Sequence, residues 1–403
     1  MKIGILNIIF LLMAFCASAQ LRLSGRVIDS ATLKPLPDAG VYIANTTSGT
    51  KANAEGIYRF SNLPPGDYTL MVRYVGYTTK RFDVSLTKDN EDFTVALSAK
   101  SIDLKEVTVR LDADWAKNLE MFKWAFLGTN NDKLCRILNQ EALNLKFDKT
   151  TNILHASSDD FLDIENYVLG YKLRFLVKEF LANYDTHRMG YDGNVTFEQL
   201  KGDGTFEDQW KQNRAYAYDG SFRHFLTTLN PGEYVESKFI IKRLIRTPNP
   251  ARPPDSVISN KIKLLSEQIK SGTGNHATDS LNKWTSLSAR PHLNYKLSNA
   301  PVSTAEIVKT SSQPGFNALQ FDGSLYIIYK GKPQENNFDN LYRFNEAGTW
   351  QVSAFNLQDP QKPVLYDKRG ITLTRNNLYF EGGWDFRIMK LLPEDYIPGW
   401  FNN

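Results

Sequence analysis

Residues 23–77 constrain the fold of this chain more than any other segment, because short apolar runs alternate there with strong turn signals. Around the start of this stretch, Leu21, Leu23 and Val27 fall on one face of an extended chain, with arginine and serine between them, as in a half-buried strand. Two prolines, a glycine and an aspartate at positions 64–67 then mark a turn. Short strands at turn spacings of roughly ten residues predict an all-β sandwich of about seven strands. We expect these strands to include residues 21–28, 41–43, 57–60, 68–74, 82–86 and 93–97.

Five short motifs carry a resemblance to a known domain family. They are GRV at 25–27, PLPDAGV at 35–41, GIY at 56–58, LPPGDY at 63–68 and VGY at 75–77. In this order they resemble the carboxypeptidase-regulatory-like domain, a transthyretin-like sandwich. The family usually has a Thr-Asp pair where this chain has Ala52 and Asn53; since Asn also caps turns, we expect the same fold. In family members the domain is an accessory fold and has no peptidase activity.

The histidines exclude the familiar zinc peptidase sites. A zinc carboxypeptidase holds its metal with a His, a Glu three residues later and a distant His. The residues three positions after the five histidines are Ser158, Gly190, Thr227, Asp279 and Tyr295, and no HExxH motif occurs. We therefore predict that the chain is not a zinc carboxypeptidase, and we assign no catalytic residue, metal ligand or cofactor site.

The first 19 residues predict a cleaved export signal. An apolar run at 3–15 follows a lysine, and the small residues Ala17 and Ala19 suit cleavage before Gln20. The run of about 13 residues is shorter than the roughly 18 to 20 that span a bilayer, so we expect no transmembrane segment after cleavage. A retained anchor and a lipoprotein at Cys16 are the weaker alternatives; a phenylalanine precedes Cys16 where a lipoprotein signal has a small residue.

The cysteine count and the charge limit the bonds and the binding partners that this chain can have. Cleavage leaves Cys135 as the one remaining cysteine, so an internal disulfide is excluded. The net charge of +4 comes from interspersed acidic and basic residues, which does not resemble a nucleic-acid-binding surface. We predict an exported protein of the periplasm or the outer membrane, whose partners are cell-envelope or outer-membrane proteins and not nucleic acids.

Six segments are expected along the chain. Residues 101–110 resemble the strand that follows such domains in TonB-dependent outer-membrane transporters, but the remaining chain is too short for their large barrel. The expected division is 1–19 signal, 20–100 sandwich, 101–110 linking strand, 111–246 α+β region with an antiparallel sheet, 247–300 insertion or mobile segment, and 301–403 β-rich C-terminal part.

The region after residue 110 predicts helices and an antiparallel meander. Aromatic residues and leucine recur at spacings of three and four over 114–127, which predicts an amphipathic helix, and 133–138 is expected to be a second one. A further helix near 210 should break at Gly220, and a short helix is expected at 261–269. Strands are expected at 143–147, 153–157, 161–164, 171–184, 195–200, 325–329, 350–355, 371–374 and 378–380.

The segment around residues 210–226 holds the candidate site. With IEN at 164–166 and LGY at 169–171, it resembles a group of exported Bacteroidota proteins with the same N-terminal sandwich, which implies no activity. Asp219, Ser221 and His224 suggest a hydrolase triad, but triads draw their members from distant segments. We favour a helix cap at Asp219 or Ser221 and a hydrogen bond from His224 to a backbone carbonyl. A binding role for Arg214, Arg223 and His224 is the alternative.

The sequence favours an exported, non-catalytic binding or scaffolding protein, because no assembled catalytic motif is present. The alternative is an envelope hydrolase acting on glycan or peptide, with a site built from residues remote in sequence, such as two facing carboxylates. A small-ligand carrier with an apolar cavity in its C-terminal sheet is a third hypothesis.

Overall fold

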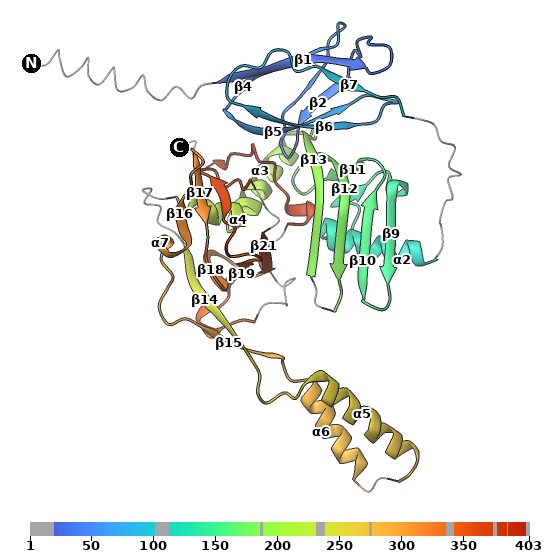
Figure 1. Ribbon diagram of the computed structural model, residues 1–403, viewed down its shortest axis with the longest axis vertical. Coiled ribbons are helices and arrows are strands. Elements are labelled where there is room, and N and C mark those ends of the chain that lie inside the picture. The colour runs from blue at the N-terminus through green and yellow to red at the C-terminus, as the bar shows by residue number, and fades with distance from the viewer. Residues whose placement is uncertain are drawn as a thin grey trace, which may run out of the picture. The chain divides into compact units, whose positions relative to one another are not determined.

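The computed structural model describes residues 20–100, 113–185, 188–230, 238–273, 276–335, 342–373, 377–384 and 386–399 (Figure 1). The expected export signal and linking strand lie outside these residues. Packing divides the chain into two compact units, of which one is Met1–Ala217 with Phe386–Asn403 and the other is Tyr218–Asp385. The sequence-based limits at 246 and 300 differ from this division, and as domain boundaries they stay a prediction.

Residues 20–100 form a β-sandwich of two sheets, which confirms the expected fold class (Figure 1). One sheet has the order β4-β1-β7, and the other has the order β3-β2-β5-β6. The strands are β1 (Leu21–Asp29), β2 (Gly40–Ile43), β3 (Gly49–Lys51), β4 (Ile57–Leu63), β5 (Gly66–Arg73), β6 (Lys80–Leu86) and β7 (Val95–Leu97). Alternation decides which face of the strand is buried: Leu23 and Val27 of β1 are fully buried, whereas Arg22 and Arg26, each next to one of them in sequence, point to the opposite face and are exposed.

The α+β part of the first unit contains a six-stranded antiparallel sheet. Its order is β8-β11-β12-β10-β9, and β13 pairs with β12 along the other side of that strand. The strands are β8 (Cys135–Ile137), β9 (Leu143–Asp148), β10 (Ile153–Ser158), β11 (Leu162–Asn166), β12 (Tyr171–Asn183) and β13 (Arg188–Gln199). The predicted hairpin at 143–157 and the long strand from 171 are confirmed.

The predicted helix from 114 is present on one face of this sheet (Figure 1). It consists of α2 (Ala113–Phe122), followed by a π-helical turn, η2 (Lys123–Leu127). The ring of Phe122 packs edge-on against Phe180 of β12 at 4.9 Å between centroids, and Phe126 packs against Phe175 at 5.2 Å. These contacts fix the apolar face that the sequence predicted.

The predicted helix at 133–138 is wrong, because this segment contains strand β8. Cys135 and Ile137 are buried beside β11, and Arg136 between them points outward to Glu165, at 2.7 Å. Pairing with β11 satisfies the hydrogen-bonding groups of the β8 backbone, and this tertiary contact overrides the local preference for a helix. Burial raises the pKa of the Cys135 thiol to about 12, so it stays protonated and unreactive.

Hydrogen bonds join the sandwich to the α+β part within the first unit. The turn after β2 donates from the Asn45 amide to the Val195 carbonyl (2.6 Å), and the Phe197 amide donates to Thr46 (3.0 Å). The Asp395 carboxylate accepts from the Thr47 amide at 3.0 Å and from its hydroxyl at 2.6 Å. A C-terminal residue therefore closes a turn of the N-terminal domain.

The second unit is built on a five-stranded antiparallel sheet of order β15-β14-β18-β19-β21 and a three-stranded sheet of order β16-β17-β20. The expected strands near 325, 350 and 378 are confirmed, whereas 371–373 form no strand and make only a bridge from Thr372 to Tyr366. The strands are β14 (Phe239–Pro248), β15 (Leu293–Leu297), β16 (Val308–Thr310), β17 (Phe316–Leu319), β18 (Ser324–Pro333), β19 (Trp350–Leu357), β20 (Val364–Asp367) and β21 (Leu378–Gly382).

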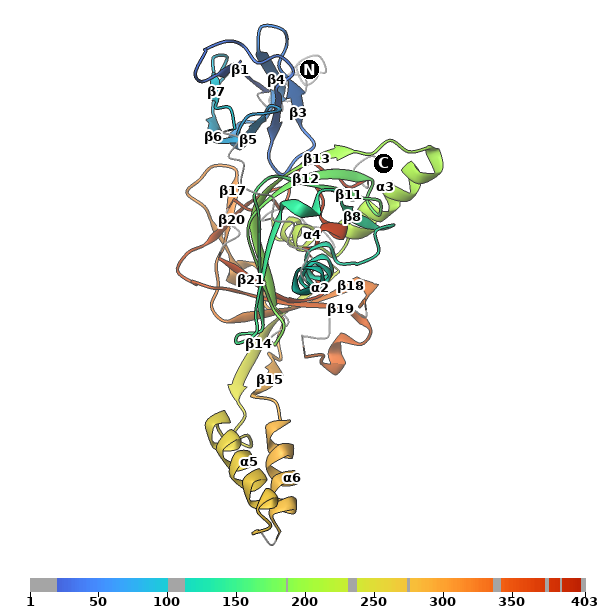
Figure 2. The ribbon, with the colours of Figure 1, turned by 90° about the vertical axis from the view of Figure 1, so that its right-hand side faces the viewer.

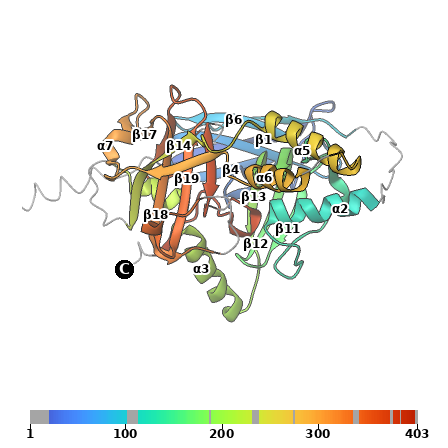
Figure 3. The same ribbon diagram turned by 90° about the horizontal axis from the view of Figure 1, so that it is seen from below.

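The connection from β14 to β15 is a helical hairpin. Helices α5 (Asp255–Lys270) and α6 (Ala277–Ser288) lie side by side (Figures 2 and 3). The predicted helix at 261–269 is the second half of α5, whereas α6 was not expected. The remaining helices are α3 (Gly204–Tyr218), α4 (Phe222–Thr227), α7 (Thr304–Ile307) and the 3-10 turns η3 (Gln140–Ala142), η4 (Asn345–Ala347) and η5 (Ile388–Lys390).

Candidate functional site

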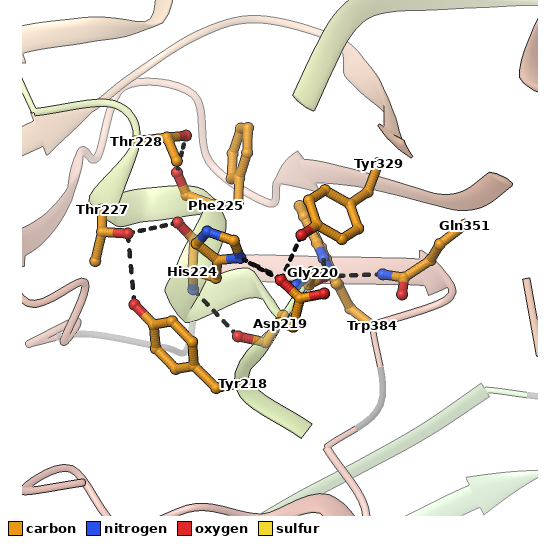
Figure 4. Close-up of polar contacts among 11 residues, drawn as sticks. Tyr218, Asp219, Gly220, His224, Phe225, Thr227, Thr228, Tyr329, Gln351 and Trp384 are labelled. Carbon is orange, nitrogen blue, oxygen red and sulfur yellow. Dashed lines mark hydrogen bonds and ion pairs between the residues drawn. The ribbon is translucent and has the colours of Figure 1, made fainter. Parts of the chain in front are cut away.

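The turn between α3 and α4 positions His224, one of the three candidate binding residues. Gly220 takes the left-handed conformation there, with φ +68°, as the predicted break in the helix requires. Its amide donates to Nδ1 of His224 at 3.0 Å, so this nitrogen bonds a backbone amide, whereas the sequence predicted a bond to a backbone carbonyl. Its carbonyl accepts from Nε2 of Gln351 at 2.8 Å and from Nε1 of Trp384 at 2.9 Å (Figure 4). The backbone of one glycine therefore connects the turn to β19 and to the segment after β21.

The His224 side chain is held in its neutral form. Burial lowers the pKa of the imidazole to about 4, which outweighs the opposing effect of the Asp219 carboxylate; Lys332 and Lys238 lower the pKa further. Nδ1 lies 3.6 Å from Asp219 Oδ1 and accepts the Gly220 amide, so in the neutral ring the proton belongs on Nε2.

The Asp219 carboxylate accepts a hydrogen bond from a tyrosine. The hydroxyl of Tyr329 on β18 donates to Asp219 Oδ1 (Figure 4). Burial and this hydrogen bond both raise the pKa of Tyr329, so the phenol remains protonated at neutral pH. The aromatic ring of Tyr329 also lies against the His224 imidazole, at 5.7 Å between centroids. The group is a packed polar cluster within the second unit.

Ser221 caps α4. Its Oγ accepts the backbone amide of His224 at 3.1 Å, as an N-cap serine does. A catalytic triad instead needs the serine hydroxyl to donate to the imidazole and the carboxylate to bond its other nitrogen. Here Nδ1 of His224 faces the Gly220 amide. The cap predicted from the sequence is present, and the observed hydrogen bonds give a triad no support.

Arg214 and Arg223 both bond to backbone carbonyls. In the first unit, Arg214 donates to Leu169 (2.7 Å) and Gly170 (3.1 Å), and its guanidinium lies 4.1 Å from the centre of the Tyr171 ring. In the second unit, Arg223 Nε donates to the carbonyl of Arg369 at 3.1 Å. A binding role for Arg214, Arg223 and His224 stays a prediction. Within the described residues, no group of three or more His, Cys, Asp or Glu side chains is arranged to hold a metal ion.

A groove of about 790 Å³ crosses the outer face of the sandwich sheet β4-β1-β7. Its walls come from β1 and β4, mainly from the alternate residues that point away from the core, and from the turn after β1 and the loop before β7. Arg22, Arg26 and Arg59 line it together with the apolar side chains of Ile28 and Ile57. The face opposite the core therefore combines these three guanidinium groups and the carboxylates of Glu91 and Asp92 with aliphatic surface.

Only one of the three arginines is paired within the part of the chain that the structure describes. Arg22 lies 2.9 Å from Asp89 and 3.0 Å from Glu91. Arg26 and Arg59 are exposed and have no ion pair with any described residue. Two guanidinium groups of the groove thus remain available to a partner.

An exposed leucine stands at the edge of the groove. Leu33 is 70% exposed and has φ +58°, a left-handed conformation that branched side chains rarely adopt. The Asp29 carboxylate holds this turn by accepting the amides of Ala31 and Thr32, each at 2.8 Å, and it also accepts the hydroxyl of Tyr77. These hydrogen bonds, led by the one from Tyr77, lower the pKa of Asp29 to about 2.

Residues 23–109, which include the whole lining of this groove except Arg22, match the model of a known domain family. The N-terminal module is a CarboxypepD_reg-like domain. The resemblance drawn from the sequence motifs is therefore confirmed. The sequence showed that Arg22 and Arg26 share a face, but the groove was missed; the alternation of Ile57, Arg59 and Ser61 along β4 was the available signal.

Solved structures give low overall similarity. Two cohesin–X-dockerin complexes from Acetivibrio cellulolyticus match 20% of this chain at 21% and 22% identity, with TM-scores of 0.17 and 0.18. The match spans 58% of those chains. A protein of unknown function from Bacteroides fragilis matches over 90% of this chain and 94% of its own, at 10% identity and a TM-score of 0.17. None of the curated proteins matches this sequence.

Among the helices that the structure describes, none is both long enough and apolar enough to cross a bilayer.

Proposed function

We propose that this chain is an exported, non-catalytic binding or scaffolding protein of the bacterial cell envelope, and that its CarboxypepD_reg-like domain carries the binding surface. The observation that carries the proposal is the groove on the outer face of β1 and β4, where Arg26 and Arg59 are exposed and unpaired among the described residues. Mixed cationic and aliphatic surface of this kind suits protein recognition. The export signal predicted at 1–19 supports a location in the periplasm or at the outer membrane.

The polar cluster in the second unit supports the non-catalytic part of the proposal. Ser221 caps a helix, His224 is neutral and accepts a backbone amide, and Asp219 accepts a tyrosine hydroxyl. Each group of the suspected triad thus has a structural use. The alternative, a hydrolase acting on glycan or peptide, has no specific observation in its favour.

The test is cross-linking of the full chain to its neighbours in living cells. We expect envelope proteins to be captured by the unaltered chain and by a Lys51→Glu control, in which the same charge reversal lies on β3 of the opposite sheet. The double variant Arg26→Glu/Arg59→Glu should lose most of this capture. Quantitative mass spectrometry of the cross-linked products measures both.

Two results would contradict the proposal. If deletion of residues 20–100 leaves every captured partner unchanged, the CarboxypepD_reg-like domain is not the binding module. If fractionation finds the full chain in the cytoplasm, with its first 19 residues still attached, the assignment to the envelope is wrong.

A further inference from the structure

We infer that the groove of the CarboxypepD_reg-like domain binds an extended acidic polypeptide segment, whose carboxylates occupy alternate positions and pair with Arg26 and Arg59. This inference rests on the proposed function and specifies the partner of the same surface.

The charges in the groove indicate what its occupant carries. Arg22 is paired with Asp89 and Glu91, whereas Arg26 and Arg59 have no ion pair among the described residues. Guanidinium groups bind carboxylates with two parallel hydrogen bonds, which gives them geometric selectivity for this group. An occupant that complements the groove therefore supplies two carboxylates.

The strand register gives the spacing of those carboxylates. In the β1–β4 pair, Arg26 lies opposite Ile57, and Ser24 lies opposite Arg59. Arg26 and Arg59 are therefore diagonal neighbours on one face, a relation that places residues about 7–8 Å apart. Alternate residues of an extended chain are about 7 Å apart and point to the same side. Acidic residues at positions i and i+2 of an extended segment match this geometry.

Other groups in the groove favour a polypeptide over a dense polyanion. Glu91 and Asp92 also line the groove, and they would repel a sulfated or phosphorylated glycan, in which negative charge is closely repeated. The aliphatic surfaces of Ile28, Ile57 and Leu33 need apolar groups to cover them. A peptide with separated carboxylates and aliphatic side chains meets both conditions.

The edge of β4 indicates that side chains, and not an added strand, carry recognition. No described strand pairs with its second edge. There the Ile57 backbone already bonds to Asn53, through its carbonyl at 2.9 Å and its amide at 2.7 Å. The register of the β1–β4 pair shifts beyond Phe60, where Asn62 has φ +64°. Such a bulge ends regular pairing and protects an edge from strand addition.

The test measures binding of synthetic peptides to the full chain by fluorescence anisotropy. The probe has glutamates at alternate positions, threonine between them, valine at both ends and blocked termini; its control has glutamine for each glutamate. We expect the glutamate peptide to bind at least about tenfold more tightly, since two charge-assisted pairs are lost in the control. We also expect its affinity to fall as salt is added.

Variants assign the binding to the groove. Arg26→Glu and Arg59→Glu should each weaken the glutamate peptide roughly fivefold or more, because reversal adds repulsion to the lost pair, whereas Lys51→Glu should leave it unchanged. Leu33→Asn, which tolerates the left-handed turn, should weaken binding through lost apolar contact. A peptide with lysine for each glutamate should bind the double variant Arg26→Glu/Arg59→Glu more tightly than it binds the unaltered chain. This result would show that the double variant is folded.

Three outcomes would overturn the inference. They are equal affinity for the glutamate and glutamine peptides, unchanged affinity in both arginine variants, and displacement of the peptide by a sulfated polysaccharide that binds more tightly. If the arginine variants lose their envelope partners while no acidic peptide binds, the inference fails and the proposed function stands.

Discussion

At the scale of single residues, burial decides what the ionisable groups of the second unit do. His224 was a candidate binding residue because imidazole is often functional, yet in the folded chain its Nδ1 accepts a backbone amide and its pKa is lowered to about 4. Asp219, next to a glycine turn, was a candidate acid and instead accepts the Tyr329 hydroxyl. Both side chains contribute to packing and to hydrogen bonding of one turn.

The first prediction concerns His224 and pH. An unfolded histidine binds a proton near pH 6.5, whereas the buried imidazole stays neutral down to about pH 4. The unfolded state therefore binds more protons in this window, and the free energy of unfolding should fall as the pH falls from 6.5 to 4, by up to about 3 kcal/mol. Urea unfolding of the full chain at several pH values measures this loss.

His224→Gln should remove much of that pH dependence, and His155→Gln, at an exposed position of β10, should not. Titration of the imidazole by NMR reports the same group directly. A His224 pKa near 6.5 would contradict the packing described for this cluster.

At the scale of elements, glycine turns connect the helices to the sheets. Gly220 ends α3, starts the turn into α4 and bonds to Gln351 and Trp384. A Cβ at this position would come within 2.5 Å of the Tyr329 ring. The element boundary is therefore fixed both by backbone conformation and by a close approach to β18.

The second prediction compares two glycines with the same φ of +68°. Gly272, in the turn after α5, has nothing within 4 Å of its Cβ direction. Gly272→Ala should cost about 1 kcal/mol from the left-handed backbone alone. Gly220→Ala should cost about 2–4 kcal/mol, since Tyr329 must also move. Unfolding free energies from urea titrations measure both, and equal costs would show that the contact with Tyr329 is not tight.

Element types were predictable where local pattern and packing agree. The amphipathic helix from 114 and the strands of the sandwich follow their expected periods. Strand β8 was not predictable as such, because its short sequence has no strong preference and pairing with β11 decides its structure. Helix α6 was not expected, and the serine, threonine and asparagine residues in 277–288 have low intrinsic helix propensity.

At the scale of the first unit, the C-terminal segment stabilises the N-terminal domain. The Asp395 carboxylate accepts two hydrogen bonds from Thr47, although the two residues are 348 positions apart. The adjacent amide of Glu394 donates to the carbonyl of Asn45. The turn after β2 is therefore held in place by Glu394 and Asp395, which lie near the C-terminal end of the described residues.

The third prediction concerns this contact. Asp395→Ala should raise the exchange rate of the Thr47 amide roughly tenfold or more, because a hydrogen bond to a charged acceptor is lost. Hydrogen exchange of the full chain measures the change. Glu55→Ala, which removes a carboxylate from another exposed turn of the same domain, should leave the Thr47 amide unchanged. Unaltered exchange in Asp395→Ala would show that this contact does not order the turn.

Local sequence patterns were enough to predict the sandwich, the order of its turns and its kinship with the CarboxypepD_reg-like domain, because period-two alternation and Pro-Gly turns are local properties. It also excluded the zinc peptidase motifs, since those depend on short spacings. Tertiary structure decided the rest. The groove exists because two strands distant in sequence place Arg26 and Arg59 as diagonal neighbours on one face, and His224 is neutral because residues from other elements bury it. Strand register and burial depend on contacts between segments that are distant in sequence, so a local sequence pattern cannot predict them.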